Sequence, residues 1–149
     1  MKTRFYENAG LSSPKILLPK KEIDYKKWAV VACDQYTSEP EYWDSVKEIV
    51  GNNPSTLKIT FPEIYLEDSD KHERISNIVG TMKEYISKKI FDENMGFVYV
   101  ERQIKEKVRK GLIVALDLEK YDYNKGSTTL VRATEGTILE RLPPRIEIR

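Results

Sequence analysis

The chain has 149 residues, of which 40% are hydrophobic and 33% are charged, and its 25 basic and 24 acidic side chains leave a net charge of +1. This composition predicts a single globular domain over residues 1–149, long enough to bury a core. The charge balance supplies no broad field that would attract DNA or anionic lipid, so it disfavours a nucleic-acid partner.

Several classes of protein are excluded or disfavoured by what the chain lacks. A single cysteine, Cys33, excludes an internal disulfide, and a single histidine, His72, disfavours a zinc site of the usual kind. No segment approaches the roughly 20 apolar residues that span a bilayer, and the N-terminus lacks the apolar core of a signal peptide. We therefore expect a cytoplasmic location and no membrane partner.

The first half of the chain predicts strands and one helix. Residues 1–14 read as an irregular arm, and the apolar run WAVVAC (28–33) predicts a buried strand that ends at Asp34. Ser38 and Glu41 have the spacing of a capping box and predict a helix over 39–50. The alternating LKITF (57–61) predicts another strand.

The second half contains the clearest helix and a hairpin. Asp70 and Glu73 form a second capping-box pattern, and apolar residues at helical spacing predict a helix over 70–90. FVYVERQI (97–104) and GLIVALDL (111–118) predict an antiparallel hairpin with a basic tip, and residues 146–149 a last strand. The fold expected is α/β or α+β, with a mixed sheet and two main helices on one face.

A few single residues carry predictions of their own. Trp28 and Trp43 are interpreted as core anchors because large aromatic side chains are usually buried. His72 is interpreted as a solvated helix residue, and Cys33 as an inert thiol in an apolar strand.

The stretch 126–149, GSTTLVRATEGTILERLPPRIEIR, is the richest in groups that can perform chemistry. Arg132, Arg141 and Arg145 lie among glutamates, threonines and two glycines. Guanidinium forks with hydroxyls and a flexible backbone can form a pocket for phosphate or carboxylate. The alternative is a strand–turn–strand in which the arginines pair with Glu135, Glu140 and Glu147 on a solvated surface.

Established motifs of catalysis are absent. The chain has no GxxxxGK[ST] phosphate loop, no GxGxxG, no HExxH, no paired CxxC and no serine-nucleophile elbow. Any catalysis would therefore rest on carboxylates, arginines and hydroxyls, and the sequence predicts no protein-only metal site.

Three segments together resemble the N-terminal part of domain-of-unknown-function family 1015. They are AVVACDQYTSEPEYW (29–43), NPSTLKITFPEIYLE (53–67) and YDYNKGSTTLVRATEGTILERLPPRIEIR (121–149). Members of this prokaryotic family usually have several hundred residues, so the resemblance implies that the chain is an N-terminal fragment. Such a fragment is expected to expose an edge strand or apolar surface that favours self-association.

The family is also distantly similar to the ParB-type and sulfiredoxin group, which includes nucleotide-binding proteins and kinases of free serine. Divergent members carry histidine–glutamate–leucine–threonine, then an arginine ten residues after the glutamate. Glu135, Thr137 and Arg145 match this pattern, whereas Thr134 stands where those members have the histidine. The resemblance implies phosphoryl transfer to a small hydroxyl substrate.

The leading hypothesis is therefore a phosphate- or nucleotide-binding domain of a small-molecule kinase, with a nucleotide or pyrophosphate and Mg²⁺ as cofactors. Glu135 would be the catalytic base, and Asp34 would bind Mg²⁺ or orient the substrate. The expected ligand-binding residues are Asp34, Arg132, Thr134, Gly136, Thr137, Arg141 and Arg145. The alternatives are a non-catalytic structural or interaction domain and, disfavoured by charge, a DNA-associated module. The substrate, the phosphate donor and the oligomeric state are not predicted.

Overall fold

The computed structural model describes residues 6, 8–132, 136, 139 and 142–148. The chain divides into two compact units. Unit 1 contains Met1–Leu18 and Glu93–Thr137, and unit 2 contains Pro19–Asp92 and Ile138–Arg149. Each unit is described by itself below.

Unit 1 is built mainly of short antiparallel strands. β1 (Leu11–Ser12) pairs with β6 (Ala115–Leu116), and β4 (Val98–Ile104) pairs with β5 (Lys107–Ile113). A short 3₁₀ helix, η3 (Leu118–Lys120), follows β6. The chain passes between the units along β2 (Lys15–Pro19) and β3 (Phe91–Met95), which form a third two-stranded sheet.

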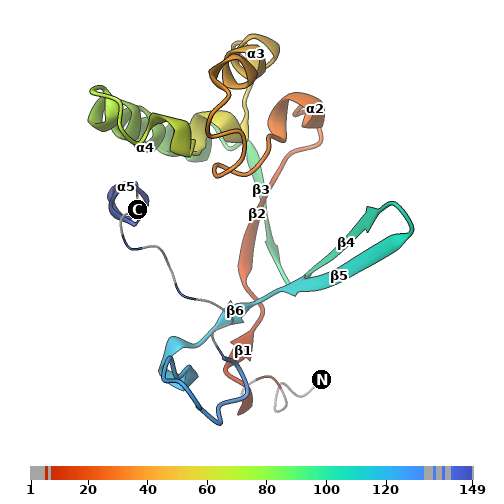
Figure 1. The fold of residues 1–149 in the computed structure, drawn as a ribbon. Coiled ribbons are helices and arrows are strands. Elements are labelled where there is room, and N and C mark those ends of the chain that lie inside the picture. The colour runs from red at the N-terminus through yellow and green to blue at the C-terminus, as the bar shows by residue number, and fades with distance from the viewer. Residues whose placement is uncertain (1–5, 7, 133–135, 137–138, 140–141, 149) are drawn as a thin grey trace. The chain divides into compact units, whose positions relative to one another are not determined.

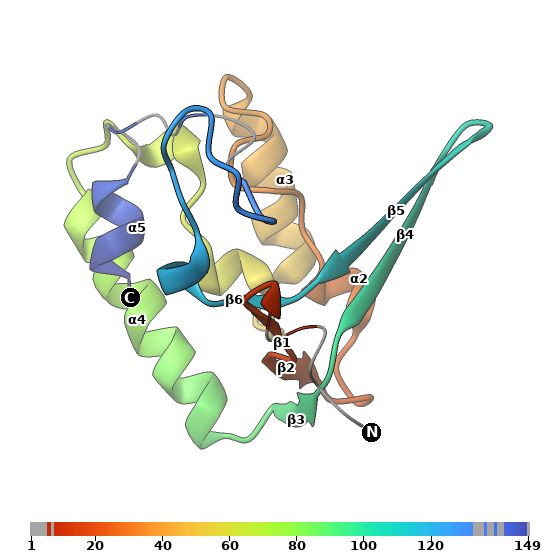
Figure 2. The same ribbon diagram turned by 90° about the horizontal axis from the view of Figure 1, so that it is seen from below.

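The β4–β5 hairpin confirms the hairpin predicted near residues 97–118, and both ribbon views show it as a long two-stranded ribbon (Figures 1 and 2). Its second strand begins at Lys107 instead of Gly111, so most of the predicted basic tip belongs to β5. All strand residues of the hairpin except Val98 are exposed. Its register places Arg102 opposite Arg109, and Glu101 opposite Lys110.

Unit 2 is mostly helical. Its helices are α2 (Tyr25–Trp28), α3 (Pro40–Val50), α4 (Lys71–Ser87) and α5 (Pro143–Glu147), with 3₁₀ turns η1 (Thr56–Ile59) and η2 (Glu63–Tyr65) between α3 and α4. Both views show α5 beside α4 (Figures 1 and 2). The predicted helices at 39–50 and 70–90 are therefore confirmed, and so is the mixed helix-and-strand class.

The core of unit 2 is formed by the apolar stripe of α4 and residues from the preceding turns. Phe61, Ile75 and Ile78 form a buried cluster, and Tyr65, Leu66 and Ile148 pack against it. A second aromatic group places half-buried Trp28 against buried Tyr85 and half-buried Phe91, with ring centroids 6.0 and 5.7 Å from that of Trp28. Trp43 is 1% exposed and donates from Nε1 to the Tyr36 carbonyl, which confirms it as a core anchor.

Three predicted strands were wrong, because an apolar run becomes a strand only when another strand pairs with it. Residues 28–33 begin at the end of α2, where Asp24 caps the helix by accepting from Lys26 N, and no ladder follows at 29–32. Residues 57–61 start as η1, because Ser55 Oγ accepts from Leu57 N. Residues 146–148 follow two prolines that suit a first helical turn, and they belong to α5 and its end.

The two predicted capping boxes were also wrong, because neither helix has the side-chain hydrogen bond to a backbone N–H that defines the motif. α3 begins after Glu39 without a side-chain cap. Asp70 stands at the start of α4, but its Oδ1 accepts from Arg74 Nε at 2.9 Å instead of from a backbone N–H. No helix among the described residues is both long and apolar enough to cross a membrane.

Candidate functional site

The site predicted in the C-terminal stretch is described in part. Thr134, Glu135, Thr137 and Arg141 lie outside the described residues. Arg132 and Gly136 belong to unit 1, and Asp34 and Arg145 belong to unit 2.

In unit 1, Arg132 contacts its own loop. Its Nε donates to the Thr129 carbonyl at 3.1 Å, and its backbone forms a bridge with Asp122. The Asn124 N–H, which donates to Asp122, holds the pKa of that exposed carboxyl below its usual value. Gly136 is exposed. These contacts organise the loop around 122–132 and leave the Arg132 side chain exposed.

In unit 2, Arg145 of α5 forms an ion pair with Glu63 of η2. Nη2 of Arg145 lies 2.6 Å from Glu63 Oε1, and the same nitrogen lies 3.7 Å from Cys33 Sγ. The side chain of Glu63 is only 6% exposed, whereas that of Arg145 is 49% exposed. A buried carboxylate thus holds one edge of a guanidinium whose side chain is half open to solvent.

The position of Glu63 depends on a contact between distant segments. Its backbone N–H donates to the Cys33 carbonyl at 2.8 Å, and Pro62 precedes it at the start of η2. A glutamate in a turn is normally expected to be exposed to solvent, so the sequence did not indicate that Glu63 would be a buried partner of Arg145. The glutamates predicted to pair with the arginines included Glu147, which instead lies 3.4 Å from His72 Nδ1.

Asp34 is exposed and is the residue after Cys33 in the chain. Because the Cys33 carbonyl accepts from the Glu63 N–H, Asp34 directly follows a residue that contacts the Glu63–Arg145 ion pair. Its Oδ1 accepts from Gln35 Nε2 at 3.4 Å. Cys33 is partly buried but lies in a loop instead of the predicted strand. His72 is exposed, as predicted, with a side chain 79% open.

The donor set for a metal is small. Among the described residues, no three His, Cys, Asp or Glu side chains come together in a way that could hold a metal ion. Mg²⁺ commonly binds through one or two carboxylates together with the phosphates of a substrate, so a lone carboxylate such as Asp34 fits only that mode.

The fold and these contacts define a small α/β protein in which a buried glutamate positions an arginine near the surface of a helical unit. The chain belongs to the family described as "Protein of unknown function (DUF1015)", whose model matches residues 17–149. Neither the curated proteins nor the solved structures contain a match to this chain.

Proposed function

We propose that this chain is the phosphate-binding part of a kinase that phosphorylates a small hydroxyl compound. The observation that carries the proposal is the placement of Arg145 by buried Glu63. Arginine presents a rigid fork that matches phosphate oxygens, and a fork held by a carboxylate loses less freedom on binding. Glu63 acts here as a positioning residue.

Asp34 supplies the second element of the proposal. Its exposed carboxylate follows Cys33, whose sulfur and carbonyl contact Arg145 and Glu63 respectively. In this role it binds Mg²⁺ carried by the phosphates of a nucleotide or of pyrophosphate, or it orients the substrate hydroxyl.

The remaining roles come from the family resemblance, for Glu135 and Thr137, and from the residue types of the 126–149 stretch for the others. Glu135 accepts the proton of the substrate hydroxyl while the new oxygen–phosphorus bond forms and the bond to the leaving phosphate breaks. Arg132 and Arg141 neutralise phosphate oxygens, and Thr134, Thr137 and the amide near Gly136 complete the cradle. Positioning and charge neutralisation account for most of the catalysis in such transfers.

Binding is tested by thermal unfolding of the 149-residue chain with ATP, ADP and pyrophosphate, each with and without Mg²⁺. A ligand at about 100 times its Kd adds roughly 2.7 kcal/mol, or roughly 5–10 °C in Tm. Arg145→Lys keeps the charge beside Glu63 but loses the fork, so it should weaken the ligand about tenfold. Arg102→Lys, on the exposed hairpin of unit 1, is the matched control and should leave the affinity unchanged.

Two outcomes would contradict the proposal. If no phosphate ligand shifts the Tm, or if Arg145→Lys binds as tightly as the wild type, then Arg145 is not a phosphate ligand. The catalytic step has its own assay, phosphate transfer from ATP or ADP to free serine, and unchanged turnover in Glu135→Gln would eliminate Glu135 as the base.

The second candidate function is a non-catalytic structural domain, and the same ion pair favours it. Glu63 and Arg145 join η2 to α5 across 82 residues of sequence, which is also what a scaffold contact does. This alternative expects Arg145→Gln to lower the Tm because it leaves a buried carboxylate without its partner, while no phosphate ligand raises the Tm of the wild type.

A further inference from the structure

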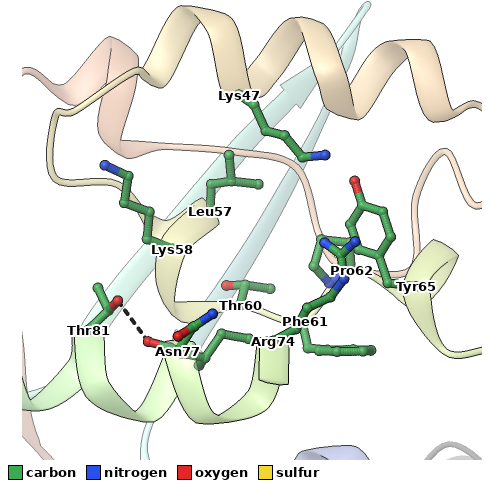
Figure 3. Close-up of a pocket in the computed structure, with 11 residues that line it drawn as sticks. Lys47, Leu57, Lys58, Thr60, Phe61, Pro62, Tyr65, Arg74, Asn77 and Thr81 are labelled. Carbon is green, nitrogen blue, oxygen red and sulfur yellow. Dashed lines mark hydrogen bonds between the residues drawn. The ribbon is translucent and has the colours of Figure 1, made fainter. Parts of the chain in front are cut away.

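A pocket in unit 2, distinct from the residues around Arg145, lies between α3, the two 3₁₀ turns and α4 (Figure 3). Its volume is about 270 Å³. Three of its lining residues are cations from different elements, namely Lys47 of α3, Lys58 of η1 and Arg74 of α4. No carboxylate is found among the described residues that line it.

We propose that this pocket is a binding site for a small organic carboxylate, with the acidic group at Lys47 and Arg74 and an apolar body on the pocket floor that extends toward Lys58. This site lies beyond the proposed phosphate site and uses none of its residues.

Two of the three cations, Lys47 and Arg74, are held in place by acids outside the lining. Lys47 Nζ lies 2.9 Å from Asp44 Oδ1, and Arg74 Nε lies 2.9 Å from Asp70 Oδ1. Burial opposes the charge of Lys47, but its contacts with Tyr65 and Asp44 outweigh burial and raise its pKa. The hydrogen bond to Asp70 raises the pKa of Arg74. Both side chains are therefore positive at neutral pH.

Tyr65 forms one wall, and both of these cations lie against it. The Arg74 guanidinium carbon is 4.1 Å from the centre of the Tyr65 ring, and Lys47 Nζ is 5.1 Å from it. Figure 3 shows these three side chains gathered at one end of the pocket, with Lys58 at the other. A cation at an aromatic face is attracted by the ring, which further restricts its position.

The floor is apolar and belongs to the core. Phe61 and Ile78, each 7% exposed, line it together with Leu57 and Pro62. The apolar part of a ligand bound here would be buried against side chains that are already packed, and this burial favours binding. The volume lies just below the usual range for ligand pockets, so the occupant is small.

Carboxylate fits better than phosphate because the donors are few. Arg74 already uses Nε for Asp70 and points Nη2 at Asp68, 3.5 Å away, so it does not offer its full fork. The neutral donors at the rim are also limited, since the Thr81 hydroxyl donates to the Asn77 carbonyl at 2.8 Å. A single negative charge matches this set more closely than a phosphate dianion, which requires more donors.

The experiment is an NMR titration of the 149-residue chain with benzoate, phenyl phosphate and benzamide. Saturable shifts of amides around the pocket are expected with benzoate, and weaker binding with the other two. Lys47→Gln removes one of the two cations at Tyr65, so it should weaken benzoate about fivefold and leave benzamide unchanged. Lys83→Gln, on the exposed face of α4, is the matched control and should bind benzoate as the wild type does.

A second variant tests the floor and the volume without changing charge. Asn77 is exposed on α4, so Asn77→Phe is tolerated by the fold, and its ring should fill the pocket and abolish benzoate binding. Absence of saturable shifts with benzoate, equal affinity for benzamide, tighter binding of phenyl phosphate, or unchanged binding in both variants would overturn the proposal. Arg145→Lys should leave benzoate binding unchanged, and Lys47→Gln should leave the Tm shift with pyrophosphate unchanged, so the two proposed sites can be tested separately.

Discussion

Tyr85→Phe removes one oxygen atom from the interior of unit 2 and leaves the ring packing in place. Tyr85 is 5% exposed, and its hydroxyl accepts from Ser55 N at 2.9 Å and donates to the Ser55 carbonyl at 3.3 Å. Ser55 is fully buried. The substitution therefore deprives a buried backbone N–H of its acceptor.

The expected cost follows from that unsatisfied donor. A buried polar group that loses its partner destabilises a protein by about 1–3 kcal/mol, and the ring contacts of Tyr85 with Trp28 and Phe91 remain. The longer bond to the Ser55 carbonyl adds little, because a carbonyl keeps a second lone pair for other partners. We expect the free energy of unfolding to fall by about 2 kcal/mol.

Urea unfolding followed by tryptophan fluorescence measures this loss. Both tryptophans, Trp28 and Trp43, lie in unit 2, so the signal reports that unit. Tyr25→Phe is the matched control, because the Tyr25 hydroxyl also donates to a carbonyl, that of Pro19, but at an exposed position. Its effect should be below about 0.5 kcal/mol. If Tyr85→Phe and Tyr25→Phe lowered the free energy of unfolding equally, the loss could not be due to the buried Ser55 N–H.

Three further predictions concern stability. Burial raises the pKa of Tyr85, so the folded state keeps the phenol proton at a pH where the unfolded state loses it. The contribution of Tyr85 to the free energy of unfolding is therefore complete below about pH 10 and is lost as the pH rises through the folded pKa. The difference in urea stability between wild type and Tyr85→Phe should shrink over that pH range. Ile78→Ala should cost about 2–4 kcal/mol because it opens a cavity beside Phe61, whereas Ile86→Ala, at a position 61% exposed, should cost less than about 0.5 kcal/mol by the same assay. Arg109→Glu replaces a cross-strand Arg–Arg pair by an opposite-charge pair and should stabilise the hairpin by about 0.5–1 kcal/mol, seen as slower amide hydrogen exchange in β4 and β5; faster exchange would contradict the register argument.

The candidate site could be predicted from the sequence only in part. Arg145 was predicted as a ligand-binding residue, yet its partner Glu63 was not, because the two are 82 residues apart and meet only when η2 and α5 pack together. The carboxylate of Glu63 became a buried group through one backbone contact with Cys33. The cationic pocket could not be predicted from the sequence either, because its three cations come from three separate elements, α3, η1 and α4.

Elements whose signal is local could be predicted from the sequence. α3, α4 and β4 form where the side-chain pattern predicted them, because the pattern of apolar side chains along one segment decides which face that segment can bury. The hairpin was predicted too, although its second strand begins four residues earlier than expected. The remaining elements depend on tertiary contacts. Residues 28–33 are an apolar run, and residues 57–61 and 146–148 alternate between apolar and polar or charged side chains; the conformation of all three segments depends on a partner strand, and the structure provides none for them among the described residues. Contacts between distant segments, such as Glu63 with Arg145 and Tyr85 with Ser55, have no local pattern, because they arise only when the helices and turns of unit 2 pack around a common core.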